Sequence, residues 1–215
     1  MSPFFVYLNM DLNKIDAIIF DFGGVLINID YHNTVDAFRS LGIPNFDKKF
    51  AQAQQTEIFD LYETGQITSE SFLQGLQEFL PAIVDQQKLV DAWNAMILDV
   101  PNEVPSFLKN LKETGKKLFL LSNTNEIHIN YALKKWKSTT ELEMDQLLNH
   151  IYLSHEIELR KPDLAIFEYV LSDQGLQPDR TLFIDDSIQH IESAKSMGIK
   201  THHLTKQSDL YEIFS

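Results

Sequence analysis

Five short apolar runs alternate along the chain with longer segments whose apolar residues recur at helical spacing. The runs predict five buried strands, at Asp16–Phe20, Lys117–Leu121, Ile151–Ser154, Thr181–Ile184 and Lys200–Leu204. The segments between them predict helices with clear ends. Leu164, Phe167, Val170 and Leu171, for example, share one helical face before Gly175, a residue type that often ends a helix. Strands that alternate with helices indicate βαβ units, and therefore a parallel sheet covered by helices on both faces.

The stretch between the first two predicted strands is too long for one crossover. About 90 residues separate Val25 from Lys117, and a single crossover helix needs far fewer. This stretch has helical periodicity of its own, with Thr68 and Asp85 as candidate N-caps. We therefore expect a small all-helical insertion over the edge of the sheet that carries Asp21. The expected organisation is an N-terminal extension (1–14), an α/β core (15–29 and 100–215) and a helical cap (30–99).

The composition narrows the function classes. The 215 residues, 44% of them hydrophobic, suffice for one domain or a domain with a small insertion. A formal charge of −13 argues against nucleic acid as a partner, and the lack of cysteine excludes disulfides and thiolate metal sites. The apolar piece before Met10 is too short for a signal peptide or a membrane span. Met10 would itself be a sensible start of translation. We expect a cytoplasmic protein that does not interact with membranes.

Carboxylates follow two of the predicted strands. Asp21 ends the first apolar run and is followed, after Phe22, by two glycines that allow a tight turn and leave room for a ligand. Asp185 and Asp186 end the fourth, and two adjacent acids there repel each other unless a cation lies between them. In an open α/β sheet the carboxyl ends of the strands form the ligand-binding edge. Together these acids offer the hard oxygen ligands that Mg²⁺ prefers.

Polar and basic groups suited to binding an anion follow the second and third predicted strands. Ser122 and Asn123 end the second strand just before a helical segment, where a hydroxyl, an amide and free N–H groups can bind an anion. Lys161 follows the third strand and precedes Pro162, which is typical of a helix start. A fixed ammonium at that point can neutralise a phosphate and a carboxylate together.

Each of these features also has a purely structural explanation. Asp21 can cap a turn, Ser122 and Asn123 are ordinary loop residues, and Asp185 and Asp186 can cap the helix that follows. Turn chemistry alone, however, does not predict that all four groups fall at the same end of successive strands. We therefore interpret them as one site.

This combination resembles the haloacid dehalogenase-like hydrolase superfamily from about Asp16 to Leu204, with the four motifs at Asp21, Ser122, Lys161 and Asp185-Asp186. The phrases Phe-Asp-Phe-Gly-Gly-Val-Leu and Leu-Ser-Asn-Thr-Asn are similar to the branch that contains α-D-glucose-1-phosphate phosphatase. The helical insertion resembles the C1 cap of that superfamily. The resemblance implies a Rossmann-like core and a Mg²⁺-dependent phosphatase for a small phosphorylated metabolite, such as the sugar phosphate glucose-1-phosphate.

The resemblance also implies roles for the site residues. Asp21 would attack phosphorus and form an aspartyl-phosphate, which water would then hydrolyse. Ser122, the Asn123 backbone and Lys161 would hold the phosphoryl oxygens. Mg²⁺ would be held by Asp21, the carbonyl of Gly23, Asp186 and, directly or through water, Asp185.

Gly23 departs from the pattern of most phosphatases of the superfamily, which carry a general acid and base Asp at that position. The departure predicts a preference for good leaving groups, or an acid supplied by water or by the cap, with Glu57, Tyr62 and Glu63 as candidates. It also leaves open a non-catalytic protein that binds a phosphorylated ligand or a protein partner. A haloacid dehalogenase is the enzymatic alternative, although the paired acids argue against it. We expect the cap to choose the substrate.

Overall fold

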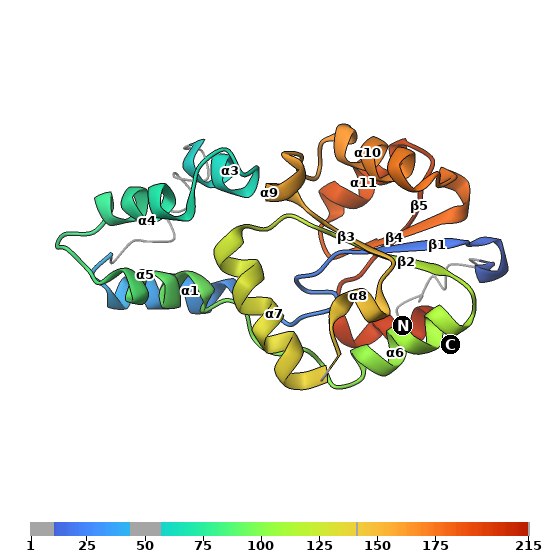
Figure 1. Ribbon diagram of the computed structural model, residues 1–215, viewed down its shortest axis with the longest axis horizontal. Coiled ribbons are helices and arrows are strands. Elements are labelled where there is room, and N and C mark those ends of the chain that lie inside the picture. The colour runs from blue at the N-terminus through green and yellow to red at the C-terminus, as the bar shows by residue number, and fades with distance from the viewer. Residues whose placement is uncertain (1–10, 44–56, 141, 215) are drawn as a thin grey trace, which may run out of the picture.

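A five-stranded parallel sheet forms the centre of the molecule, in the order β3-β2-β1-β4-β5 (Figure 1). The computed structural model describes residues 11–43, 57–140 and 142–214, without the side chain of Glu57. The strands are β1 (Ala17–Phe20), β2 (Lys117–Ser122), β3 (His150–Leu153), β4 (Thr181–Asp185) and β5 (Lys200–His203). Every strand end falls within one residue of its expected position, and the α/β fold class is confirmed.

Helices cover both faces of the sheet, because neighbouring side chains of each strand point to opposite sides. Ile18 and Phe20 pack in one apolar cluster, whereas Ala17 and Ile19 pack in another. The first cluster is covered by α6 (Val104–Glu113), α7 (Glu126–Thr140), α8 (Met144–Leu147) and η3 (Gln207–Phe214). The second is covered by α10 (Leu164–Gln174) and α11 (Ile188–Ser196), on the opposite side in Figure 1. The remaining short helices of the core are η1 (Leu12–Lys14), α9 (Ser154–Ile157) and η2 (Pro178–Arg180).

One residue of the expected helical face of α10 is not buried. Phe167, Val170 and Leu171 pack against the sheet, but Leu164 is 46% exposed. Leu164 is the first residue of α10, directly after the N-cap Asp163. The four residues all lie in one helix, but only the last three belong to the core. Gly175 ends the helix in the left-handed conformation, as expected.

The long insertion after β1 is helical throughout its regular elements in the described range. It contains α1 (Tyr31–Ser40), α3 (Glu57–Glu63), α4 (Ser69–Glu78) and α5 (Gln86–Asn94), which lie to one side of the sheet in Figure 1. These helices share an apolar cluster of their own, separate from the two sheet clusters. Thr68 and Asp85 cap α4 and α5 by accepting backbone N–H bonds from Ser71 and Gln87, so both predicted N-caps are confirmed.

Two antiparallel chain segments join these helices to the sheet. Asn28 donates its N–H to the carbonyl of Asp99 and accepts one from Leu98, and the N–H of Asp30 bonds to the carbonyl of Met96. The expected division into a core and a cap, with boundaries at 29/30 and 99/100, falls within this pair of segments. Those boundaries stay a prediction.

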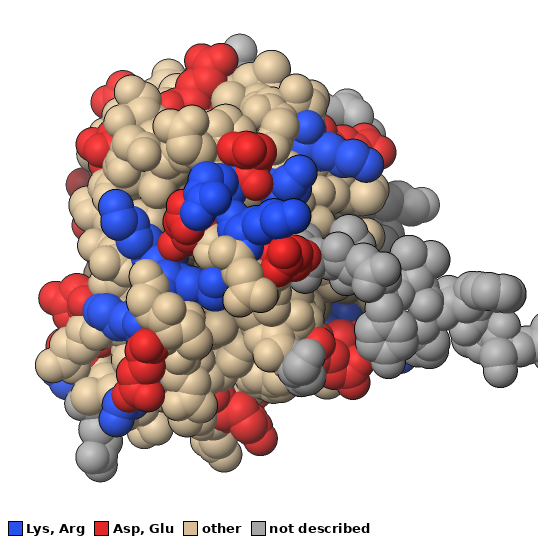
Figure 2. Space-filling view, turned by 90° about the vertical axis from the view of Figure 1, so that its right-hand side faces the viewer, with Lys and Arg blue, Asp and Glu red and all other residues tan. Residues whose placement is uncertain are grey.

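The end of the molecule opposite the cap carries many of the basic side chains (Figure 2). A hollow of about 510 Å³ there is lined by Lys116, Lys117 and Arg180. Two of these cations have local partners: Lys116 donates to the carbonyls of Leu12 and Ile15, and Arg180 forms a paired hydrogen bond with Asp16. The patch therefore holds the amino ends of the strands together. Within the described ranges, no helix combines the length and the apolar character needed to cross a membrane.

Candidate active site

The strand register brings Asp21 to the carboxyl edge of the sheet. Phe20, the residue before it, pairs with Leu120 on β2 and with Ile184 on β4, and the N–H of Asp21 continues the ladder to the carbonyl of Ile184 at 2.9 Å. Asp185 follows Ile184, so the two carboxylates leave neighbouring strands at the same level. Central strands with apolar residues on both faces therefore deliver two acids to one point.

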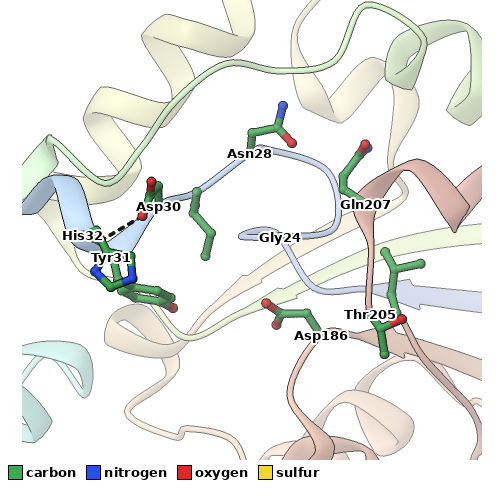
Figure 3. Close-up of a pocket in the computed structure, with 10 residues that line it drawn as sticks. Gly24, Asn28, Asp30, Tyr31, His32, Asp186, Thr205 and Gln207 are labelled. Carbon is green, nitrogen blue, oxygen red and sulfur yellow. Dashed lines mark hydrogen bonds between the residues drawn. The ribbon is translucent and has the colours of Figure 1, made fainter.

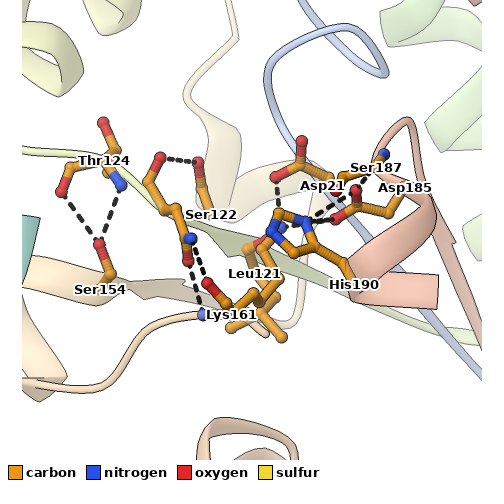
Figure 4. A network of polar contacts seen from close by, with 10 residues as sticks. Asp21, Leu121, Ser122, Thr124, Ser154, Lys161, Asp185, Ser187 and His190 are labelled. Atoms are coloured by element: carbon orange, nitrogen blue, oxygen red, sulfur yellow. Dashed lines mark hydrogen bonds and ion pairs between the residues drawn. The ribbon is translucent and has the colours of Figure 1, made fainter. Parts of the chain in front are cut away.

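Lys161 joins these two acids (Figure 4). Its ammonium is fully buried and donates to Asp21 Oδ1 at 2.7 Å, to Asp185 Oδ2 at 2.7 Å and to the carbonyl of Leu121 at 2.9 Å. These three acceptors use all three donors of an ammonium. Burial alone would lower the pKa of Lys161, but the two carboxylates raise it, so the side chain stays charged.

Asp185 is buried among donors. Besides Lys161, it accepts the Ser187 N–H at 2.7 Å and lies 2.9 Å from Nδ1 of His190. Burial opposes ionisation, but Lys161 and His190 lower the pKa of Asp185 to about 2. Because an ionised carboxylate only accepts, Nδ1 of His190 carries the proton of this bond. Asp185 does not cap the following helix, whose N-cap is Ser187, because its bond to the Ser187 N–H lies ahead of the first turn.

Asp21, Asp185 and Asp186 could hold a metal ion, since one oxygen of each lies within 4.8 Å of the others. Three carboxylates against one ammonium leave two negative charges when all are ionised, which suits a divalent cation. Burial raises the pKa of Asp21 to about 6, against the opposing pull of Lys161, and burial and Asp185 together raise that of Asp186. Both shifts indicate carboxylates that still need positive charge, and their hard oxygens fit Mg²⁺.

Gly24 makes room for Asp186. Its φ is +74°, and a Cβ on this residue would lie 2.5 Å from Oδ2 of Asp186. A side chain at this position would therefore displace one of the candidate metal ligands. The adjacent Gly23 lines the cavity above Asp21, and a Cβ there would meet only the flexible side chain of Ile29, at 3.2 Å.

Ser122 and Asn123 lie on the other side of Asp21, at the end of β2. Both line the cavity, but the amide of Asn123 is already occupied, because it donates to the Lys161 carbonyl at 2.7 Å and accepts the Lys161 N–H at 2.8 Å. This reciprocal pair holds the backbone of Lys161 beside β2. The Ser122 hydroxyl makes only a long contact of 3.5 Å with the Asn123 carbonyl. The structure thus brings all the predicted site residues into one cluster.

The cavity above Asp21 has a volume of about 250 Å³. Its floor is polar, with Asp21, Ser122, Lys161 and Asp186. Its remaining lining is mixed, with the apolar residues Phe22, Ile27, Ile29, Met96, Ile97 and Ala132 and the polar residues Tyr31, Asn123, Thr124, His128, Ser187 and His190. The arrangement fits an anionic group at the floor and an attached organic group above it.

Two of the three candidate proton donors of the cap, Tyr62 and Glu63, are not among the described residues that line this cavity. The Tyr62 hydroxyl lies 2.7 Å from the hydroxyl of Ser69 and accepts the N–H of Ile127 at 3.1 Å. Glu63 pairs with Arg160 at 3.0 Å; burial raises its pKa, and Arg160 opposes that rise. The side chain of Glu57 lies outside the described residues.

Sequence reasoning missed His190 and Arg160. His190 lines the cavity and bonds to Asp185 from the first turn of α11, and helical spacing did not indicate this bond because Asp185 lies five residues earlier, before the helix begins. Arg160 pairs with Asp60 and Glu63 of α3, and no local pattern indicated partners about 100 residues away.

The fold and the cluster together define an α/β protein whose parallel sheet carries a carboxylate at its edge, held against a lysine and beside a second pair of acids. The chain belongs to the haloacid dehalogenase-like hydrolase family, whose model matches residues 15–198. A D-ribitol-5-phosphate phosphatase from Bacteroides thetaiotaomicron is 29% identical over 187 residues, which cover 87% of this chain and 90% of the relative.

Solved structures agree with this assignment. A family enzyme from Bacteroides thetaiotaomicron, crystallised with magnesium and inorganic phosphate, superposes with a TM-score of 0.81 at 34% identity, covering 87% of this chain and 93% of the other. An L-2-haloacid dehalogenase has a TM-score of 0.59 at 20% identity over 87% of this chain and 85% of its own, so it shares the fold. The predicted family and the prediction of an enzyme are confirmed.

Proposed function

We propose that this protein is a Mg²⁺-dependent phosphatase that hydrolyses a small phosphorylated metabolite through an aspartyl-phosphate on Asp21. The observation that carries the proposal is the position of Asp21 at the floor of the cavity, with one oxygen bound to Lys161 at 2.7 Å. The other oxygen is left to attack a phosphorus atom above it. The relative that hydrolyses D-ribitol-5-phosphate supports the same chemistry.

The reaction balances in two displacements. In the first, an Asp21 oxygen forms a bond to phosphorus, the bond from phosphorus to the ester oxygen breaks, and the leaving oxygen takes a proton from water. In the second, water attacks the same phosphorus, Asp21 leaves as a carboxylate, and inorganic phosphate and a proton are released. Lys161, Ser122 and the backbone at Asn123 hold the phosphoryl oxygens while charge moves between them.

Asp21, Asp186, the Gly23 carbonyl and Asp185 would hold the magnesium ion. When bound, Mg²⁺ shields the like charges of Asp21 and the phosphate group and stabilises the charge on the transferring phosphoryl oxygens. Among these residues, Asp186 is the more exposed acid and forms no ion pair in the described part of the chain, so it is best suited to direct ligation. Asp185 already accepts bonds from Lys161, Ser187 and His190, so it orients Lys161 as well.

Because position 23 is a glycine, no carboxylic acid next to the nucleophile can donate a proton to the leaving group. General acid catalysis is worth about 10²–10⁴-fold, so esters with good leaving groups are the better substrates. Tyr62 and Glu63 are engaged in other contacts, which makes water the simplest proton source. Sugar and polyol phosphates are the substrate class we propose, with glucose-1-phosphate and D-ribitol-5-phosphate as specific candidates.

The test is phosphate release from these two esters, a nucleotide and phenyl phosphate, with and without Mg²⁺. An Asp21→Asn variant serves as the blank, since the amide is a poor nucleophile and keeps the shape of the site. We expect Mg²⁺-dependent release that Asp21→Asn reduces at least 10³-fold, which is the scale expected for loss of a covalent nucleophile. Folded protein that binds Mg²⁺ and releases no phosphate would contradict the proposal and favour a binding role, and halide release from a 2-haloacid would favour a dehalogenase.

A further inference from the structure

A second cavity adjoins the site cavity. It has a volume of about 380 Å³, and the two share Ile29, Tyr31 and Asp186 as lining residues. Figure 3 shows it between the loop that runs from Gly24 to His32 and the chain segment that carries Thr205 and Gln207. The first segment ends in the first turn of α1, and the second follows β5 of the sheet domain. The cavity is within the size range of small-molecule sites, about 300–1,000 Å³.

The two cavities differ in how many polar groups they leave free. In the site cavity the Asn123 amide is bonded to Lys161, His190 to Asp185, and the two ring nitrogens of His128 to Asn125 and to the Trp93 carbonyl. Substrate hydroxyls placed there would therefore find few free partners. The second cavity offers amide, carboxylate, imidazole and hydroxyl groups from Asn28, Asp30, His32, Thr205 and Gln207. Hydroxyl groups of a substrate that extends from the site cavity past Tyr31 and Asp186 could form hydrogen bonds in the second cavity.

These polar groups keep spare bonding capacity. The side chain of Asn28 bonds to the Asp99 carboxylate through Nδ2, at 3.3 Å, and that of Gln207 uses its Nε2 for the carbonyl of Val25, also at 3.3 Å. Their side-chain carbonyls can accept further bonds. Asp30 uses one oxygen for the N–H of His32 and retains the second. Thr205 is exposed at the wall of the cavity.

We propose that the second cavity binds the hydroxyl-bearing part of a polyol or sugar phosphate and that Thr205 and Gln207 help to select it. The inference rests on the proposed phosphatase function. It differs from the expectation that the cap chooses the substrate, because the segment after β5 belongs to the sheet domain.

The test compares kcat/KM for D-ribitol-5-phosphate with kcat/KM for phenyl phosphate, whose leaving group lacks further hydroxyls. Thr205→Val and Gln207→Leu should each lower the ratio of the two constants by about 3- to 10-fold, the scale of one hydrogen bond. Ser208→Ala, an exposed neighbour that does not line the cavity, should leave the ratio unchanged. Equal effects of Thr205→Val and Gln207→Leu on both esters, or no effect, would overturn the proposal.

A binding measurement separates this inference from the proposed function. Calorimetry on Asp21→Asn protein with Mg²⁺ compares D-ribitol-5-phosphate with inorganic phosphate, with and without Thr205→Val. Tighter binding of the ester that Thr205→Val weakens supports the cavity even if the wild-type protein hydrolyses nothing, in which case only the phosphatase function fails. Equal affinity for ester and phosphate in both proteins overturns the cavity while turnover of phenyl phosphate leaves the phosphatase function intact.

Discussion

Single residues at the carboxyl edge of the sheet contact several groups at once, so substitution of any one of them disturbs more than one interaction. Lys161 uses three donors on three acceptors, and Asp185 accepts from three different groups. Gly24 meets two requirements, a φ of +74° and the absence of a Cβ beside Asp186. At this scale the function depends on how closely backbone and side chain can approach.

Gly24→Ala should raise the Mg²⁺ concentration for half-maximal activity by about 10- to 100-fold, the scale at which disturbed ligand orientation changes metal affinity. The reason is that the new Cβ would lie 2.5 Å from Oδ2 of Asp186 and displace it. Gly115→Ala is the matched control, because its φ is +83° and nothing lies within 4 Å of the added carbon. Both variants carry the left-handed strain of about 1–2 kcal/mol. An equal Mg²⁺ requirement in both would contradict the argument.

His128 provides a pH-dependent contribution to stability. Its ring stacks on Trp93 at 4.6 Å, and burial lowers its pKa to about 4, from an ordinary value near 6.5. As pH falls below 6.5, His128 becomes protonated in the unfolded chain but stays neutral in the folded protein. Its contribution to the free energy of unfolding is therefore present at pH 7 and is lost progressively toward pH 4.

When the pH is lowered from 7 to 5, protonation of His128 in the unfolded chain should therefore reduce the free energy of unfolding by about 2 kcal/mol. Urea unfolding at the two pH values measures this, with His128→Gln as the reference. Asp21, whose raised pKa acts in the opposite direction, is present in both proteins and cancels in the comparison. The same pH dependence in wild type and variant would show that His128 does not titrate in this way.

At the scale of elements, α3 of the cap contacts the sheet domain next to the site. Asp60 and Glu63 pair with Arg160, the residue before Lys161. Two residues beyond α3, a Cβ on Gly65 would lie only 2.1 Å from the His155 carbonyl, so the backbones approach as closely as glycine allows. These contacts place the cap helix against the loop that carries Lys161.

Arg160→Gln should lower kcat/KM by up to about 5-fold, because loss of the ion pairs with Asp60 and Glu63, worth about 1 kcal/mol, weakens the contact between α3 and the Lys161 loop. Thermal stability should change little, since such partly exposed pairs contribute about 1 kcal/mol or less. Arg180→Gln is the control, as Arg180 pairs with Asp16 at the other edge of the sheet. If both variants lost activity equally, the effect would not come from the cap.

The elements themselves could be predicted from the chain, while their mutual contacts could not. The apolar runs of β1 and β4 predict strands that are buried on both faces of the sheet. The pairing of these two strands then brings Asp21 beside Asp185. The exposure of Leu164 depends on where α10 begins. The pairing of Arg160 with Asp60 joins residues 100 apart in sequence, and no periodicity carries that information.

At the scale of the whole molecule, three apolar clusters divide the chain into two parts. Two clusters lie on the faces of the sheet, and the third lies among α1, α3, α4 and α5. Between the parts there are polar contacts, such as the hydroxyl of Tyr62 with the N–H of Ile127 and the Trp93 carbonyl with His128, and a few apolar ones, since Trp93 stacks on His128 and Ile127 packs against the third cluster. Such a division predicts that the cap can lose its packing without unfolding the sheet.

Phe72→Ala tests this division. Phe72 is fully buried in the cap cluster, stacked on Tyr62 at 4.2 Å and 5.0 Å from Trp93, so its loss should destabilise the cap by about 3–5 kcal/mol. Hydrogen exchange should then rise in α4 and α5 while β1, β2 and β4 keep their protection. Phe183→Ala, equally buried on β4 against Phe167, should instead weaken protection in the sheet. Loss of sheet protection in Phe72→Ala would mean that the cap and the sheet unfold as one unit. Protected strands with lost phosphatase activity would show that an intact sheet edge needs the packed cap above it to act.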